Sequence, residues 1–163
     1  MLVVSLVLTA GTHADTPAGL MKLDGRAAPG LVLTGVDLGK FDLKKQRGRW
    51  VLVHFWASWC GPCRKELPTI QRLAKRIDQN KLKVVMINTA ESEDEIFIFL
   101  SSVAPDLDSY LDRDGSITER WQPRGLPSSF FVDPQGKLRY LALGGRPWDQ
   151  KPYIEFVRGL YAR

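Results

Sequence analysis

The sequence predicts a single α/β domain in which a central β-sheet is flanked by helices. Apolar runs typical of buried strands alternate with segments whose apolar residues recur at helical spacing, which is the pattern of a layered α/β sandwich. The length of 163 residues, with 44% hydrophobic and 25% charged residues, suits one domain with a substantial core. The sequence contains no low-complexity tract and no internal repeat, so the fibrous, disordered and solenoid classes are excluded.

The first 14 residues resemble a secretory signal peptide. An apolar run from Leu2 to Ala10 is followed by small residues that end at Ala14. As a helix this run would span only about 14 Å, well short of the ~30 Å hydrocarbon core of a bilayer. We therefore predict a signal peptide over residues 1–14, with a truncated membrane anchor or a buried N-terminal strand as the alternatives.

Residues 15–30 are rich in Ala, Gly, Pro and Thr, which predicts an extended lead-in without secondary structure. The domain itself is expected over residues 31–163. Its first two apolar segments, 31–33 and 41–43, are separated by glycines and predict a β-hairpin at the edge of the sheet. The nearly continuous apolar run at residues 50–56 predicts a central strand that is covered on both faces.

The middle of the chain predicts two helices with a strand between them. From Gly61 to Ile77 the apolar residues recur at helical spacing, and residues 83–88 form a second apolar run typical of a central strand. Ser92 and Glu95 form a capping box, which starts the second helix, and its apolar stripe ends at Val103.

The last third of the chain predicts shorter elements that end in a hairpin and a helix. Turn-forming residues from Asp133 to Gly136 join two apolar strands, and the final segment has apolar residues along one side. We expect strands at residues 108–112, 129–132 and 138–143, and helices at residues 116–121 and 150–161.

The chain contains two cysteines, Cys60 and Cys63, at the start of the first predicted helix. Structural zinc needs four ligands, and the sequence adds only two histidines, His13 and His54. Covalent haem needs a histidine directly after the second cysteine, where Arg64 stands. We therefore expect no metal site, and thiol–disulfide chemistry remains. The only redox group that we expect is the Cys60–Cys63 disulfide itself.

The spacing of the two cysteines predicts different roles for their sulfurs. At the mouth of a helix, the Cys60 sulfur faces unpaired N–H groups and the positive end of the helix dipole, which favour the thiolate. Cys60 is therefore the expected nucleophile, and Cys63, one turn further along, is the expected resolving thiol. Pro62 fits the first turn, where its missing N–H costs little. A purely structural disulfide is the less favoured alternative, because so short a ring constrains the unfolded chain little.

Three segments of the chain carry a family pattern: Ala28-Pro29, residues 53–68 with Trp59-Cys60-Gly61-Pro62-Cys63, and residues 125–137. Together they resemble the thioredoxin-like superfamily and, within it, the extracytoplasmic TlpA/ResA-like thiol-disulfide oxidoreductases. The resemblance extends from about residue 28 to the C-terminus. It implies a thioredoxin-like sandwich, with a central mixed β-sheet flanked by helices and an N-terminal β-hairpin extension. It also implies a periplasmic or otherwise extracytoplasmic location.

The resemblance implies roles for residues outside the dithiol. Pro127 matches a cis-proline that packs beside the dithiol and leaves the Leu126 carbonyl free to bind an extended partner strand. Glu91 stands where relatives carry an acidic residue, and it could carry a proton to or from Cys63; alternatively it only joins the acidic residues at a helix start. His54 replaces the Asp or Asn of relatives and could act as a base, but a neutral, hydrogen-bonded histidine is the favoured interpretation.

The predicted substrate contacts are Trp59, Gly61, Pro62 and Leu126. Trp59 offers a flat apolar surface beside the dithiol, whereas Trp148 is expected to pack against the last helix. In the family, the Gly61-Pro62 dipeptide accompanies reducing centres, so the resemblance favours a reductase. A peroxiredoxin is not expected, because no threonine precedes the first cysteine at the peroxidatic spacing.

The expected function is an exported reductase of protein disulfides, which acts through a Cys60 mixed disulfide that Cys63 resolves. The resemblance points to cysteines of apocytochrome c or of a copper-site assembly protein as substrates, and an oxidising compartment implies a membrane-borne electron donor. The alternatives are a disulfide oxidase or isomerase and a non-enzymatic Cu(I)-binding thiol module. The formal charge of +5 comes from Lys and Arg residues spread along the chain, so we expect no nucleic-acid partner. We also expect a monomer.

Overall fold

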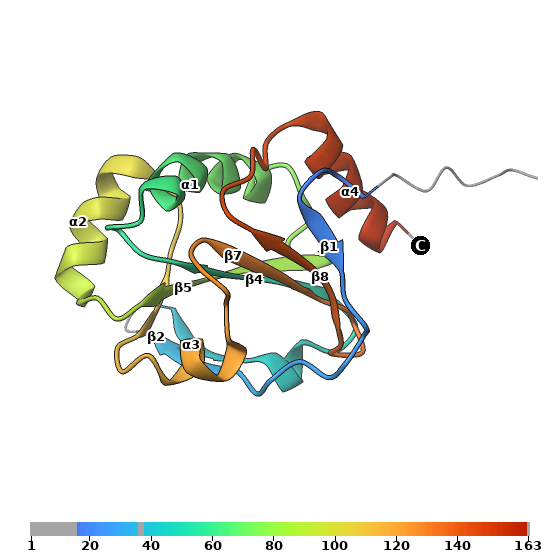
Figure 1. Ribbon diagram of the computed structural model, residues 1–163, viewed down its shortest axis with the longest axis horizontal. Coiled ribbons are helices and arrows are strands. Elements are labelled where there is room, and N and C mark those ends of the chain that lie inside the picture. The colour runs from blue at the N-terminus through green and yellow to red at the C-terminus, as the bar shows by residue number, and fades with distance from the viewer. Residues whose placement is uncertain (1–15, 36–37, 163) are drawn as a thin grey trace, which may run out of the picture.

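A computed structural model describes residues 16–35 and 38–162 and has the thioredoxin-like α/β sandwich that the sequence predicts (Figure 1). The predicted signal peptide, residues 1–14, lies outside the described residues. A six-stranded sheet runs through the middle of the molecule, and helices cover both of its faces. No helix in the described part of the chain is long and apolar enough to cross a membrane.

The central sheet is mixed and is organised around β4 (Trp50–Trp56), which pairs in parallel with β5 (Leu82–Thr89) and antiparallel with β7 (Ser128–Val132). The order of the strands is β1-β8-β7-β4-β5-β6. The remaining strands are β1 (Leu20–Lys22), β6 (Tyr110–Asp112) and β8 (Leu138–Leu143). Because β4 and β5 lie inside the sheet, both of their faces are covered, which explains their nearly continuous apolar sequences.

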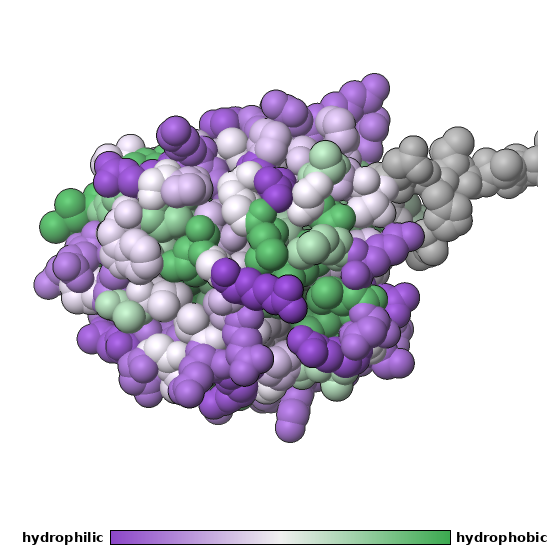
Figure 2. Space-filling view, in the orientation of Figure 1, coloured by the Kyte–Doolittle hydropathy of each residue, from purple (hydrophilic) through white to green (hydrophobic). Residues whose placement is uncertain are grey.

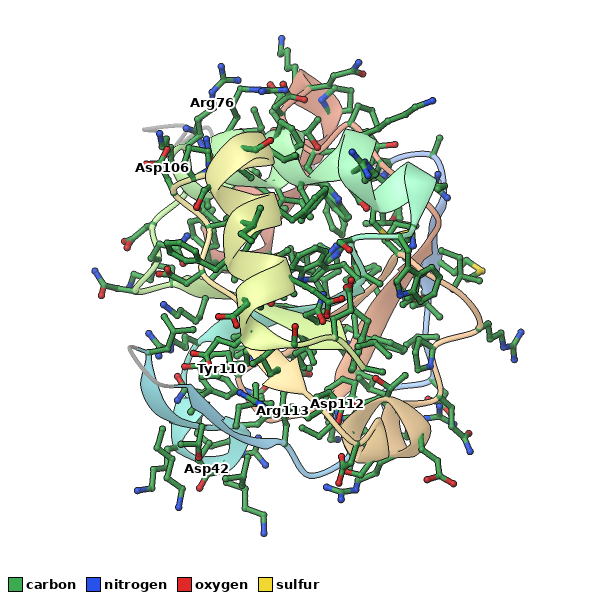
Figure 3. The ribbon with its side chains drawn as sticks, turned by 90° about the vertical axis from the view of Figure 1, so that its left-hand side faces the viewer. Asp42, Arg76, Asp106, Tyr110, Asp112 and Arg113 are labelled. Carbon is green, nitrogen blue, oxygen red and sulfur yellow. A yellow bond between two sulfur atoms is a disulfide. The ribbon has the colours of Figure 1, made fainter. Side chains whose placement is uncertain are left out.

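Two different layers cover the faces of this sheet (Figure 1). One layer consists of the helices α1 (Gly61–Ala74), α2 (Glu93–Val103) and α4 (Lys151–Tyr161). The other consists of the hairpin β2 (Val32–Gly35) and β3 (Gly39–Asp42), the 3-10 helix η1 (Leu43–Gln46) and α3 (Ser116–Trp121). Figure 3 shows Asp112 at the end of β6. Its carboxylate accepts hydrogen bonds from the N–H groups of Ile117 and Thr118, at 3.1 and 2.7 Å, and so holds the first turn of α3.

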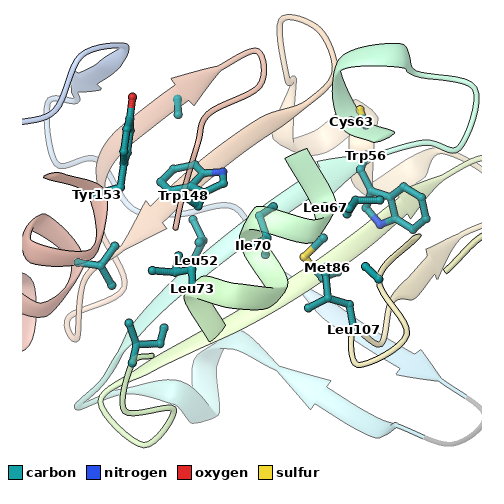
Figure 4. Close-up of a cluster of buried hydrophobic side chains, with 14 of the residues drawn as sticks. Leu52, Trp56, Cys63, Leu67, Ile70, Leu73, Met86, Leu107, Trp148 and Tyr153 are labelled. Carbon is teal, nitrogen blue, oxygen red and sulfur yellow. The ribbon is translucent and has the colours of Figure 1, made fainter. Parts of the chain in front are cut away.

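Alternate residues of β4 enter two separate hydrophobic cores. Leu52 and Trp56 belong to the core around α1, which Figure 4 shows in close-up. Val53 and Phe55 belong to the core beneath the opposite face, together with residues of the hairpin and of α3. Full burial of side chains of this size stabilises a fold by about 1.5–3 kcal/mol each. The register of β4, and with it the position of the dithiol at its end, is therefore strongly determined.

On the face shown in Figure 2, apolar patches lie in the middle and at the left end, and hydrophilic residues lie between and around them. The large apolar side chains that stay exposed in the described part of the chain are those of Met21, Val32, Trp59, Phe97 and Ile98. Only Trp59 belongs to the predicted site.

The prediction that residues 15–30 lack secondary structure is wrong. β1 pairs antiparallel with β8 through Leu20 and Ala142, and Ala27 forms an isolated bridge with Lys137. The edge of β8 carries backbone N–H and C=O groups that a neighbouring strand satisfies. β1 is only three residues long, which is too short for a strand pattern to appear in the sequence.

The structure also differs from the prediction in the placement of the hairpin and in the bounds of several elements, such as β6, which begins at Tyr110 rather than Asp108. The hairpin β2–β3 is present, but it forms a two-stranded sheet of its own instead of an edge of the central sheet. It passes directly into η1, because the Asp42 carboxylate accepts a hydrogen bond from the Lys44 N–H at 2.9 Å. The first helix ends at Ala74 rather than Ile77. Ile77 had extended the helical pattern because it is buried, although the chain has already left the helix there.

Candidate active site

The dithiol lies where β4 ends and α1 begins. Cys60 is the N-cap residue of α1, and its sulfur accepts a hydrogen bond from the Cys63 N–H at 3.2 Å. Pro62 lies in the first turn, where its missing N–H is not needed by the helix. Cys60 and Cys63 form a disulfide, with 5.2 Å between their Cα atoms. The predicted position of Cys60 at the mouth of a helix is therefore confirmed.

The two sulfurs differ in their access to a partner. Cys60 is 5% exposed, whereas Cys63 is completely buried. Trp59, the residue before Cys60, is 69% exposed. The Cys60 sulfur is therefore the more accessible of the two, while the roles of nucleophile and resolving thiol stay predictions.

The predicted substrate strand site lies at the start of β7. Ser128 is the register partner of Phe55, so β7 begins beside the end of β4. The preceding Leu126–Pro127 peptide bond is cis, as the resemblance implies. Within residues 16–35 and 38–162, the Leu126 carbonyl accepts no hydrogen bond. This carbonyl is therefore available to an incoming extended segment.

Glu91 connects two loops next to the dithiol. Its Oε2 accepts hydrogen bonds from the Ser58 N–H at 2.7 Å and from Asn88 Nδ2 at 2.6 Å, and its Oε1 accepts one from the Ser58 hydroxyl. These contacts hold the segment that carries Trp59 and Cys60. The structure thus gives Glu91 a positioning contact that the sequence analysis did not foresee, while proton transfer to Cys63 stays a prediction.

His54 is completely buried in the middle of β4. Its Nδ1 lies 2.8 Å from the hydroxyl oxygen of Ser129 on β7, and its Nε2 lies 3.9 Å from Oε2 of Glu66 on α1. Burial lowers the pKa of His54 from 6.5 to about 3, so the imidazole is neutral at physiological pH. The favoured prediction of a neutral, hydrogen-bonded His54 agrees with this environment, and a base that titrates near neutrality does not.

Glu66 is a buried carboxyl group that the sequence analysis missed. Its Oε1 accepts hydrogen bonds from the Arg146 N–H at 3.1 Å and from the indole N–H of Trp148. Burial raises the pKa of Glu66 from 4.5 to about 7, although these hydrogen bonds and the positive charge of Arg146 oppose the shift. Between about pH 3 and pH 7 both His54 and Glu66 are therefore neutral, and their contact is not an ion pair.

A signal for Glu66 is present in the sequence. It follows Cys63 by three positions and directly precedes Leu67, so it lies within the apolar stripe that α1 turns toward the core. A carboxylate on the buried face of a helix is unusual and indicates either a buried partner or a shifted pKa.

The comparison with known families decides the assignment. A model of the AhpC/TSA family matches residues 25–141. The chain belongs to the AhpC/TSA family. The matched part includes β4, the dithiol, α1 and the cis-proline, so the residues of the site lie within the family's shared fold.

The AhpC/TSA assignment agrees with individual relatives. The chain is 28% identical over 121 residues to the thiol-disulfide oxidoreductase ResA of Bacillus subtilis, covering 74% of this chain and 68% of that protein. It is 29% identical over 136 residues to the thioredoxin-like protein YneN of the same organism, covering 82% and 78%. The crystal structure of a putative thiol:disulfide interchange protein DsbE from Chlorobium tepidum is 28% identical, with a TM-score of 0.74 over 85% of this chain and 97% of that one. With its own Cys60–Cys63 disulfide, this AhpC/TSA member is a thiol-disulfide oxidoreductase.

A cavity of about 540 Å³ opens beside the dithiol of this AhpC/TSA member. It lies between the first half of α1 and the segment that connects β8 with α4, and Trp148 in that segment packs against Tyr153 of α4, as predicted. The cavity is lined by Gly61, Pro62, Lys65, Glu66, Thr69, Gly145, Arg146 and Pro147. The predicted contact residues Gly61 and Pro62 thus line this cavity, while their contact with a substrate stays a prediction.

Proposed function

We propose that the protein is an exported reductase of protein disulfides. The reducing direction rests on the ionisable groups buried behind the dithiol, which are the carboxyl group of Glu66 and the neutral imidazole of His54. Strong oxidants of this chemistry stabilise their reduced, thiolate form. Glu66 and His54 add no positive charge, so the thiolate gains little stabilisation beyond that of the helix N-terminus. The dithiol therefore gives up its electrons readily.

The reaction proceeds in two exchanges that pass two electrons to the substrate. The Cys60 thiolate attacks one sulfur of the substrate disulfide, the S–S bond of the substrate breaks, and the departing sulfur takes up a proton. Cys63 then loses its proton and attacks the Cys60 sulfur, which breaks the mixed disulfide and releases the second substrate thiol. The protein is left with the Cys60–Cys63 disulfide, and the substrate gains two thiols.

The substrate is bound as an extended segment at the start of β7. Its backbone hydrogen-bonds to the free Leu126 carbonyl, and Trp59 covers the exchanging sulfurs with an apolar surface. A side chain next to the substrate cysteine enters the cavity beside Gly61 and Pro62. We propose cysteines of apocytochrome c or of a copper-site assembly protein as the substrates, on the basis of the TlpA/ResA-like resemblance.

We place the enzyme outside the cytoplasm because residues 1–14 have the apolar run and small residues of a signal peptide. An oxidising compartment keeps a reductase in its disulfide form unless electrons are supplied. A membrane-borne electron donor therefore reduces Cys60–Cys63 after each turnover.

The reducing direction is tested by equilibrating the protein with glutathione buffers and measuring the fraction of the Cys60–Cys63 disulfide. We expect a potential near the −270 mV of thioredoxins, roughly 150 mV below that of the strong oxidant of the bacterial periplasm. A value near −120 mV would contradict the proposal and favour the oxidase or isomerase alternative.

The substrates are identified by trapping with Cys63→Ser. This variant forms the mixed disulfide through Cys60 but cannot resolve it, so mass spectrometry of the captured protein names the substrate. The double variant Cys60→Ser/Cys63→Ser is the matched control and should capture nothing. Function that persists in Cys60→Ser, together with Cu(I) binding, would show that the protein is a metal-binding module and not a reductase.

A further inference from the structure

Two buried polar atoms face each other beneath the dithiol without a hydrogen-bond partner. They are His54 Nε2 and Glu66 Oε2, which lie 3.9 Å apart, and neither has a partner in the described part of the chain. A buried polar atom that makes no hydrogen bond is costly, so a pair of them in mutual reach requires an explanation. A shortening of about 1 Å would bring the two atoms to hydrogen-bond distance.

The opposite ends of both side chains are anchored. His54 Nδ1 contacts the Ser129 hydroxyl at 2.8 Å, and Glu66 Oε1 accepts hydrogen bonds from Arg146 and Trp148. A chain of polar contacts therefore runs from the loop before α4, through α1 and β4, to β7. Each of its two central groups directs one free atom toward the other.

In the described part of the chain, the groups that face this pair come from β5, β7, α1 and the segment after β8. β7 contributes the hydroxyl of Ser129, and β5 contributes the apolar side chain of Met86, the register partner of His54. On α1, the neighbour of Glu66 one turn earlier is Cys63. The segment after β8 contributes the guanidinium of Arg146, whose positive charge favours the ionised form of Glu66.

Two arrangements satisfy both free atoms while His54 stays neutral. If Glu66 is a carboxylic acid, its O–H donates to His54 Nε2, the imidazole carries its hydrogen on Nδ1, and Nδ1–H donates to the Ser129 oxygen. If Glu66 is a carboxylate, the imidazole carries its hydrogen on Nε2 and donates it to Glu66, and Nδ1 accepts from the Ser129 O–H. The second arrangement holds one proton fewer than the first.

We propose that His54 is a positioning residue that responds to the loss of the Glu66 proton with a change of tautomer and thereby reverses the hydrogen bond of Ser129. Ser129 stands two residues after the cis-proline, at the strand that is proposed to bind the substrate. The protonation state behind the resolving Cys63 is in this way linked to the strand beside the nucleophile. This inference rests on the proposed function for its biological meaning, but the tautomer change itself does not depend on that function.

The proposal is tested on the oxidised protein without substrate, by NMR of ¹⁵N-labelled histidine from pH 5 to pH 9. The chain has two histidines, and His13→Gln removes the signal of the other one. We expect neutral shifts for His54 throughout, with Nδ1 and Nε2 exchanging their protonated and unprotonated shifts around pH 7, the pKa of Glu66. An unchanged tautomer over this range would overturn the proposal.

Glu66→Gln is the matched variant, because its side chain has the same size and does not ionise in this range. Its amide N–H can donate to His54 Nε2, so we expect His54 to keep its hydrogen on Nδ1 at every pH. A tautomer change that persists in Glu66→Gln would also overturn the proposal. Both outcomes are independent of the redox potential, so failure of this inference is distinguishable from failure of the proposed reductase function.

Discussion

The outer and inner sides of the dithiol differ in how they are built. On the outer side, Trp59 is 69% exposed, and the partly exposed Glu91 holds the loop through Ser58. On the inner side, His54 and Glu66 are buried together with Cys63. The outer side therefore presents groups to a partner, whereas the inner side removes groups from water.

This difference separates two tasks of the site. On the outer side, the exposed Trp59 is expected to contribute little to folding stability, so this side chain can contact a partner without a cost to the fold. Burial changes the protonation equilibria of the inner side, and this costs stability at some pH values. A thiol-disulfide oxidoreductase needs both, because it must admit a protein substrate and control the proton of a buried thiol.

The largest expected effect comes from replacing each of the two cysteines by serine in turn. Cys60→Ser should abolish reduction of protein disulfides, because the accessible nucleophile is lost. Cys63→Ser should also stop turnover but should still react once with a substrate disulfide. Electrophoresis without reducing agent measures the trapped adduct. Equal amounts of adduct in both variants would show that the two sides of the dithiol are not functionally distinct.

Glu66→Gln tests the inner side through stability. Because the pKa of Glu66 is raised from 4.5 to about 7, the folded protein binds this proton more tightly than the unfolded chain, and stability is lost as the pH rises through this range. The variant lacks this loss. The unfolding free energy of the variant minus that of wild type should therefore increase by about 3 kcal/mol between pH 4.5 and pH 7.

Urea titrations at pH 4.5, 6 and 7.5 measure this difference. His54 has the opposite dependence, because its pKa is lowered to about 3 and its unfolded form takes up a proton as the pH falls below 6.5. The two groups should offset each other between about pH 4.5 and 6.5 in wild type. If the difference in unfolding free energy between Glu66→Gln and wild type did not change with pH, this would contradict the burial of an ionisable Glu66.

Glu91→Ala tests how the outer loop is held. Its loss leaves the Ser58 N–H and Asn88 Nδ2 without their acceptor, so we expect a destabilisation of about 1–3 kcal/mol, measured by urea denaturation. Glu93→Ala is the control, since in the described part of the chain the Glu93 side chain makes an exposed ion pair with Arg113, whose loss should cost at most about 1 kcal/mol. Equal losses of unfolding free energy in both variants would show that Glu91 does not position the loop.

Trp59→Ala should have the smallest effect on folding. An exposed side chain without partners usually changes stability by no more than about 0.5 kcal/mol. We expect a higher KM for a protein disulfide but unchanged reduction of a small aromatic disulfide, because only the protein extends over Trp59. Phe97→Ala is the matched control, with 71% exposure on α2, and should change neither rate. Loss of both activities in Trp59→Ala would instead show that Trp59 supports the dithiol itself.

Most of the fold follows from local patterns in the sequence. β4, β5 and the helices were predicted because each contains a periodic or continuous run long enough to be recognised. β1 was missed because its three residues form a strand only through pairing with β8. The separate sheet of β2 and β3 was also missed, since a hairpin pattern does not state what the hairpin packs against.

The site divides in the same way. The sequence alone determined the dithiol, its place at a helix N-terminus, and that Cys60 caps the helix while Cys63 lies within it. These features depend on residues that are neighbours in the chain. Only the tertiary structure decided the inner side, where the partners of Glu66 stand 80 and 82 positions away and Ser129 stands 75 positions from His54. Burial and hydrogen bonding set a pKa, and both come from segments that meet only when the chain has folded.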